Sequence, residues 1–140
     1  MQGVRKYSVD TSYFERWSHE MAYILGFISA DGNVYKSTLS IEVHPKDKLV
    51  LKFIKIQISP DSVIINKPNR SRLRINSVEL IKSLSKFNIV PNKSKTIRID
   101  FEIPSEFLGD YIRGMFDGDG GVYIRRNSIE SMFCSASKGF

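Results

Sequence analysis

Polar and apolar positions change period several times along the chain, and each change predicts a new element. Residues 18–30 form a mostly apolar run behind Ser18, and serine is one of the residues that cap helix N-termini. This run predicts a helix that ends at Asp31-Gly32. Residues 34–44 then alternate between apolar and polar side chains, which is typical of a hairpin with one buried face.

A helical pattern followed by a strand-pair pattern occurs a second time. Residues 45–59 return to helical spacing behind Pro45, and residues 63–65 and 72–76 suit a second pair of strands. A third helix is predicted over residues 77–87. The predicted order is therefore αββαββα, an α+β fold.

The C-terminal part of the chain repeats the start of the first unit. Shifting the sequence by 88 residues (111 − 23) superposes identical residues, which indicates a duplicated unit. The identical pairs include Tyr23/Tyr111, Ile24/Ile112, Gly26/Gly114, Asp31/Asp119, Gly32/Gly120, Val34/Val122 and Tyr35/Tyr123. We divide the chain into an N-terminal arm (1–17), a first repeat (18–103) and a partial second repeat (104–140) with only a helix and a hairpin. We expect this shorter copy to leave an apolar edge that a partner covers.

Composition narrows the classes of partner. The 140 residues include 21 Lys and Arg against 15 Asp and Glu, a net charge of +6, which favours a polyanion such as nucleic acid. Cys134 with two histidines provides no zinc-binding spacing. The sequence shows no apolar run of membrane-spanning length, and residues 1–6 are not followed by the apolar stretch that a secretory leader needs, so we expect no leader. We therefore expect an intracellular protein, cytoplasmic (nucleoid) or organellar, that is not secreted and has no membrane partner.

The duplicated segment carries the candidate chemistry. Gly26 and Gly114 lack side chains that would hold two helix backbones apart, so the two helices are expected to pair closely. If they run parallel, Asp31 and Asp119 meet at one end, where the helix dipoles already favour a cation. Carboxylates suit magnesium and the hydrolysis of phosphodiesters. Asp117 aligns with Ser29, and we expect it to pack or cap rather than bind metal.

Two nine-residue segments carry a family resemblance. Ile24-Leu25-Gly26-Phe27-Ile28-Ser29-Ala30-Asp31-Gly32 and Ile112-Arg113-Gly114-Met115-Phe116-Asp117-Gly118-Asp119-Gly120 resemble the paired motifs of LAGLIDADG homing endonucleases. Ser29 and Arg113 depart from the family pattern. The resemblance implies a pseudo-twofold αββαββα saddle, with the motif helices at its centre, that straddles double-stranded DNA and cuts both strands.

The resemblance also implies the site residues. Asp31 and Asp119, with the preceding Ala30 and Gly118, would hold Mg²⁺ or another divalent cation such as Mn²⁺, and both aspartates would be catalytic. Lys93 resembles the basic residue that the family places near an active site, where a lysine could stabilise transition-state charge.

Alternation within the hairpins predicts a DNA-facing surface. A two-stranded ribbon fits the major groove, where Arg, Asn and Glu can bind base edges. The predicted contacts are Tyr35, Ser40, Glu42, His44, Lys67, Arg70, Arg72, Arg74, Asn76, Tyr123 and Arg125.

Two functions remain open on these residues. The first is a site-specific DNA endonuclease of the intron-homing type. The second is a binding protein without cleavage, either an RNA maturase or a regulator, or one piece of a split enzyme completed by a second chain or a dimer. The two retained aspartates favour the endonuclease, and the shorter second repeat favours the alternatives.

Overall fold

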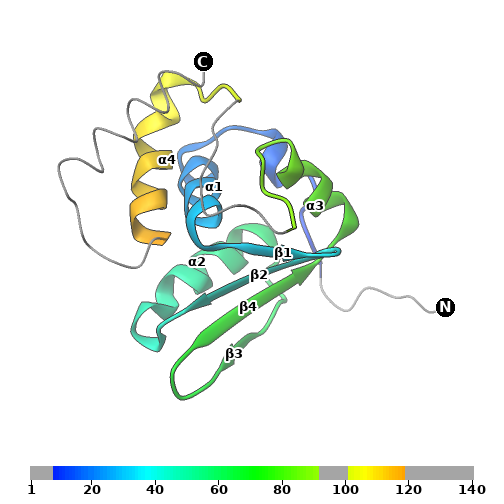
Figure 1. Ribbon diagram of the computed structural model, residues 1–140, viewed down its shortest axis with the longest axis vertical. Helices are drawn as coiled ribbons and strands as arrows, with labels where there is room; N and C mark the ends of the chain where they lie inside the picture. The colour runs from blue at the N-terminus through cyan, green and yellow to red at the C-terminus, as the bar shows by residue number, and fades with distance from the viewer. Residues whose placement is uncertain (1–7, 92–100, 119–140) are drawn as a thin grey trace.

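Four antiparallel strands form one sheet, and helices cover one of its faces (Figure 1). The computed structural model describes residues 8–91 and 101–118. Within these residues the sheet order is β1-β2-β4-β3, with every neighbouring pair antiparallel. The strands are β1 (Asn33–Tyr35), β2 (Thr38–Val43), β3 (Ile64–Asn66) and β4 (Ser71–Asn76). The predicted α+β class and both predicted hairpin regions are thus confirmed, although β2 pairs with β4 across the two hairpins.

Four α-helices accompany the sheet in the described residues. They are α1 (His19–Asp31), α2 (Lys48–Ile58), α3 (Val78–Ser85) and α4 (Ser105–Gly118). Ser18 caps α1 by accepting a hydrogen bond from the Met21 amide at 3.0 Å, as its position in the sequence predicts. Ser77 accepts from the Leu80 amide at 3.1 Å in the same way. No described helix is both long and apolar enough to cross a membrane.

Two predicted helix boundaries are wrong. The segment behind Pro45 begins as a 3₁₀ turn, Pro45–Asp47, because the His44 Nδ1 accepts from the Lys46 amide at 3.1 Å and caps this short turn. The α-helical part starts only at Lys48. The third helix ends at Ser85 rather than at residue 87, since the chain turns back through Asn88, which has a φ of 65°.

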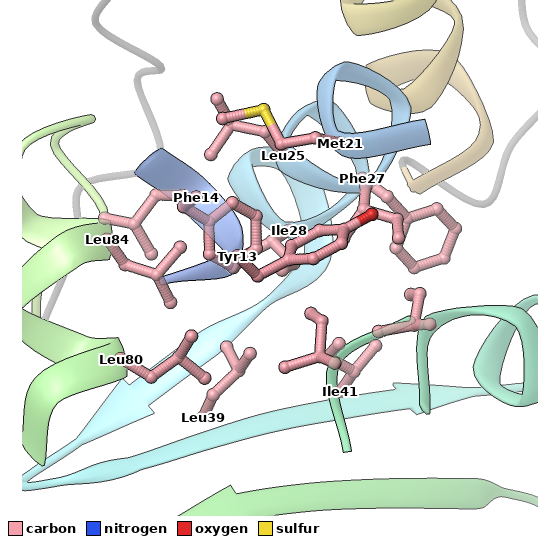
Figure 2. Packing of buried hydrophobic residues seen from close by; sticks show 14 of the residues in the cluster. Tyr13, Phe14, Met21, Leu25, Phe27, Ile28, Leu39, Ile41, Leu80 and Leu84 are labelled. Atoms are coloured by element: carbon pink, nitrogen blue, oxygen red, sulfur yellow. The ribbon is translucent and has the colours of Figure 1, made fainter. Parts of the chain in front are cut away.

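The core lies between α1, α2, α3 and the inner face of the sheet. Leu39 and Ile41 point from β2 toward Ile28 of α1 (Figure 2), and all three side chains are fully buried. Tyr13 and Phe14 of the 3₁₀ turn Tyr13–Glu15 pack into the same cluster. Part of the segment that precedes α1 therefore belongs to the core.

The strand registers separate the two faces of the sheet. Leu39 pairs with Ile75 and Ile41 with Leu73 on the inner face, where all four are buried. The intervening residues point to the opposite face, because side chains alternate along a strand. Three cross-strand rows result on this outer face: Tyr35/Thr38/Asn76, Asn33/Ser40/Arg74 and Glu42/Arg72/Ile65.

Two leucines of α2 give a matched test of the core. Leu51 is fully buried, whereas Leu49 is 74% exposed. We expect Leu51→Ala to lower the free energy of unfolding by about 2–5 kcal/mol, because it removes buried methyl groups and leaves a cavity. Leu49→Ala should change it by less than about 0.5 kcal/mol. Urea unfolding of both variants measures the difference, and equal effects would contradict the assigned helix face.

Candidate functional site

The backbones of α1 and α4 touch at two glycines. A Cβ atom built on Gly26 would lie 2.0 Å from the carbonyl oxygen of Tyr111, and one built on Gly114 would lie 2.0 Å from that of Tyr23. Gly26 corresponds to Gly114 in the repeat, and Tyr23 corresponds to Tyr111, so each contact is the counterpart of the other. The helix pair therefore has a local twofold relation. Any side chain at either glycine would force the helices apart. Both glycines thus lie where the backbones of α1 and α4 are in contact.

Two hydroxyl hydrogen bonds repeat the same relation. The Tyr111 hydroxyl donates to Ser29 Oγ at 3.2 Å, and the Tyr23 hydroxyl donates to Asp117 Oδ2 at 2.6 Å. Burial raises the pKa of the Tyr23 phenol, and the bond to Asp117 raises it further. Asp117 thus acts as an acceptor between the helices, as expected, and the two tyrosines pack at the interface.

The helices run parallel, and their C-terminal ends meet. Contacting residues have increasing numbers on both helices. At one end His19 lies beside Phe107. At the other end Ala30 lies beside Gly118, where a Cβ on the glycine would be 3.1 Å from Ala30 Cβ. Asp31 is the last residue of α1 at this end. The predicted partners Asp119 and Lys93 lie outside the described residues. Within residues 8–91 and 101–118 no three His, Cys, Asp or Glu side chains gather as a metal site would require.

Aromatic rings join the N-terminal ends of the helix pair. Trp17 stacks on Phe107 with centroids 6.0 Å apart, while Phe101 lies edge-on to both Phe87 and Tyr111. This cluster links the segment before α1, the end of α3 and the start of α4. Sequence reasoning did not identify it, since Trp17 is far from the other rings in the chain and the rings follow no single period.

An ion pair also joins α1 and α4 near their N-terminal ends. His19 Nδ1 lies 2.6 Å from Asp110 Oδ2, so a side chain of α1 binds one of α4. The hydrogen bond to Asp110 is the main reason that the pKa of His19 lies above its ordinary value of 6.5, and the charges of Glu20 and Glu106 add to it. The pairing was not predicted, because it depends on which faces of the two helices meet.

The outer face of the sheet brings together most of the predicted DNA contacts. Tyr35, Ser40, Glu42, Arg72, Arg74 and Asn76 occupy the three outer rows. Lys67 and Arg70 close the turn between β3 and β4 through mutual backbone hydrogen bonds of 2.7 and 3.3 Å. This confirms that the polar residues of both hairpins share one face.

Other predicted contacts lie apart from these rows or outside the described residues. His44 follows the end of β2, and its ring caps the 3₁₀ turn. Tyr123 and Arg125 are not among the described residues. Exposed apolar groups also occur on the outer face, with Tyr35 67% and Ile65 46% exposed. Sequence alternation placed Tyr35 on this face but did not single out Ile65.

Comparisons with known proteins give two archaeal relatives. No family model matches the chain. It is 32% identical over 120 residues to DNA-directed RNA polymerase subunit Rpo1C of Methanocaldococcus jannaschii, an overlap of 79% of this chain and 14% of the subunit. It is 35% identical over 123 residues to Uncharacterized protein MJ0398 of the same organism, covering 81% of this chain and 43% of that protein. The chain thus spans less than half the length of either relative.

Two glycines of α4 give a matched test of the helix contact. We expect Gly114→Ala to lower the free energy of unfolding by about 1–3 kcal/mol or more, because the new methyl group overlaps the Tyr23 carbonyl. A Cβ on Gly109 would meet nothing within 4 Å, so Gly109→Ala should stabilise the helix by about 0.4–1 kcal/mol. Thermal unfolding compares the two, and a stable Gly114→Ala protein would disprove the close contact.

The His19–Asp110 pair predicts a pH-dependent stability. Because folding raises the pKa of His19, the stabilisation is present in full below pH 6.5 and is lost as the pH rises through the raised pKa. We expect His19→Gln to lower the melting temperature more at pH 5.5 than at pH 8.5. The difference should disappear in an Asp110→Asn background, which isolates the pair in a double-mutant cycle. A pH-independent effect of His19→Gln would contradict the pairing.

Proposed function

We propose that this protein is a DNA endonuclease of the LAGLIDADG homing type, which binds double-stranded DNA on the outer face of its sheet and hydrolyses phosphodiester bonds. The observation that carries the proposal is the reciprocal contact of α1 and α4 at Gly26 and Gly114. It coincides with the two segments that resemble the motifs of that family. A helix pair of this closeness sets Ala30, near the end of the first segment, beside Gly118 of the second.

The outer sheet face supports DNA as the ligand. Its rows and the adjoining turn carry Lys67, Arg70, Arg72 and Arg74, and the chain has a net charge of +6. Cationic side chains bind phosphates, and arginine also binds guanine edges in the major groove. The helices occupy the inner face (Figure 1), so the outer face is the one that a duplex can approach.

The C-terminal ends of α1 and α4 offer oxygen atoms, which are the donors that divalent cations prefer. Asp31 supplies a carboxylate where the C-terminal, partly negative ends of two helices meet, and oxygen donors fit Mg²⁺ or Mn²⁺. In our proposal Asp31 and Asp119 hold the cation with help from the Ala30 and Gly118 carbonyls. Such an ion, when bound, activates water and offsets the charge that develops on phosphate. Lys93 would stabilise the same charge from the protein side.

A second candidate is nucleic-acid binding without cleavage. Rpo1C, one of the relatives, is by its name a subunit of a DNA-directed RNA polymerase, which favours a nucleic-acid or protein partner of some kind. A chain that matches only 14% of that subunit would then be a binding module or one part of a split enzyme. The outer sheet face would serve either candidate.

Nicking of plasmid DNA separates the two candidates. With a plasmid library that carries random inserts, we expect Mg²⁺-dependent nicking that falls about 100-fold or more in Asp31→Asn, since the variant loses a charged oxygen that would hold the cation. DNA binding should persist in that variant. Asp61→Asn, on the exposed turn after α2, is the matched control and should nick normally.

The outcomes assign the function. Binding without nicking by the unaltered protein, in Mg²⁺ and in Mn²⁺, would support the second candidate. Equal nicking by Asp31→Asn would exclude Asp31 from the reaction. Cleavage that appears only when a second polypeptide is added would identify a split enzyme.

A further inference from the structure

Glu42 is the acidic side chain of the three outer-face rows. It stands directly opposite Arg72 in the β2–β4 register. Its two carboxylate oxygens are divided between two arginines: Arg72 Nη1 donates to Oε2 and Arg70 Nη1 donates to Oε1, each at 3.4 Å. One carboxylate therefore holds two of the cations that the sequence places on the DNA-facing surface.

Arg72 is restrained more than its neighbours. Its side chain is only 16% exposed, compared with 62% for Arg70. Its Nε–H is buried and has no hydrogen-bond partner in the described residues. A buried donor without an acceptor costs free energy, so a ligand that draws this side chain outward and supplies acceptors would remove that cost.

Arg74 provides the contrast within the same strand. Its partner across the β2–β4 ladder is Ser40, and its side chain is exposed. No carboxylate stands opposite Arg74 in its row, so its charge is available to any phosphate. The two arginines of β4 thus differ in restraint, although they are two residues apart and point to the same face.

We propose that Glu42 is a positioning residue for DNA sequence selection, an inference that rests on the proposed function. Glu42 holds Arg70 and Arg72 back from phosphates and orients Arg72 toward base edges. The carboxylate neutralises part of the charge on both arginines, which weakens their attraction to phosphates of any sequence. Arg72 keeps further N–H donors beside the one that binds Glu42, and a guanine in the major groove offers two acceptors for them, O6 and N7. The carboxylate therefore weakens non-specific binding and raises the selectivity for a guanine at the Arg72 position.

Salt-dependent binding to a random-sequence duplex tests the restraint. In Glu42→Gln, each arginine that becomes free to bind a phosphate should steepen the slope of the log association constant against log salt concentration by about 0.9. At 0.15 M salt this slope corresponds to a non-specific affinity about fivefold higher than that of the unaltered protein for each such arginine. Glu102→Gln is the matched control, because it removes the same charge at an exposed position outside the sheet. It should leave the slope unchanged.

Selection from a random duplex library tests the orientation. We expect the unaltered protein to enrich a guanine at one defined position and Glu42→Gln to lose that enrichment. Arg72→Lys keeps the charge without the planar fork, so it should retain the salt slope and lose the same guanine. Melting temperatures within a few degrees of the unaltered protein establish that both variants are folded.

The results distinguish this inference from the function on which it rests. If the unaltered protein binds no duplex DNA, the proposed function fails and the role of Glu42 fails with it. If it binds but Glu42→Gln matches Glu102→Gln in slope and enrichment, only the role of Glu42 is wrong. Weaker non-specific binding by Glu42→Gln would also overturn the role, because it would make Glu42 a contact residue.

Discussion

Direct contact between the backbones of α1 and α4 is the constraint on which the arrangement of the two motifs depends. At Gly26 and Gly114 the space for even a methyl group is taken by the carbonyl oxygen of the facing helix. Such an approach fixes the rotation and the height of each helix relative to the other. It also brings Tyr23 and Tyr111 within hydrogen-bond distance of acceptors on the opposite helix. These contacts leave the two helices no alternative register.

Parallel pairing has an electrostatic cost that the surrounding residues offset. Two helix dipoles aligned in the same direction place like partial charges at each end. At the N-terminal end, the aromatic cluster and the His19–Asp110 pair hold the helices together. At the C-terminal end, Asp31 is the last residue of α1, and this is where our proposal places a divalent cation.

The two faces of the sheet differ in composition and burial. Leu39, Ile41, Leu73 and Ile75 complete the core, while the residues between them include the arginines of the outer face. A substitution on the outer face is therefore expected to have little effect on folding, and under our proposal it changes DNA binding. Glu42 shows that charge on the outer face is also organised, because one carboxylate restrains two arginines of different exposure.

Local sequence was sufficient for the helix at residues 18–30, the strand pairs and the shared polar face, because caps and periodicity act over a few residues. The repeated spacing in the chain also pointed to both interface glycines. Local sequence did not locate the start of α2 or the end of α3 correctly, where the His44 cap and the turn at Asn88 decide. The pairing of Glu42 with Arg70 and Arg72, the His19–Asp110 contact and the aromatic cluster arose only in the tertiary structure. The side-chain hydrogen bonds of Glu42 and His19 join residues 28 or more positions apart, and no local pattern specifies which faces of distant elements will meet.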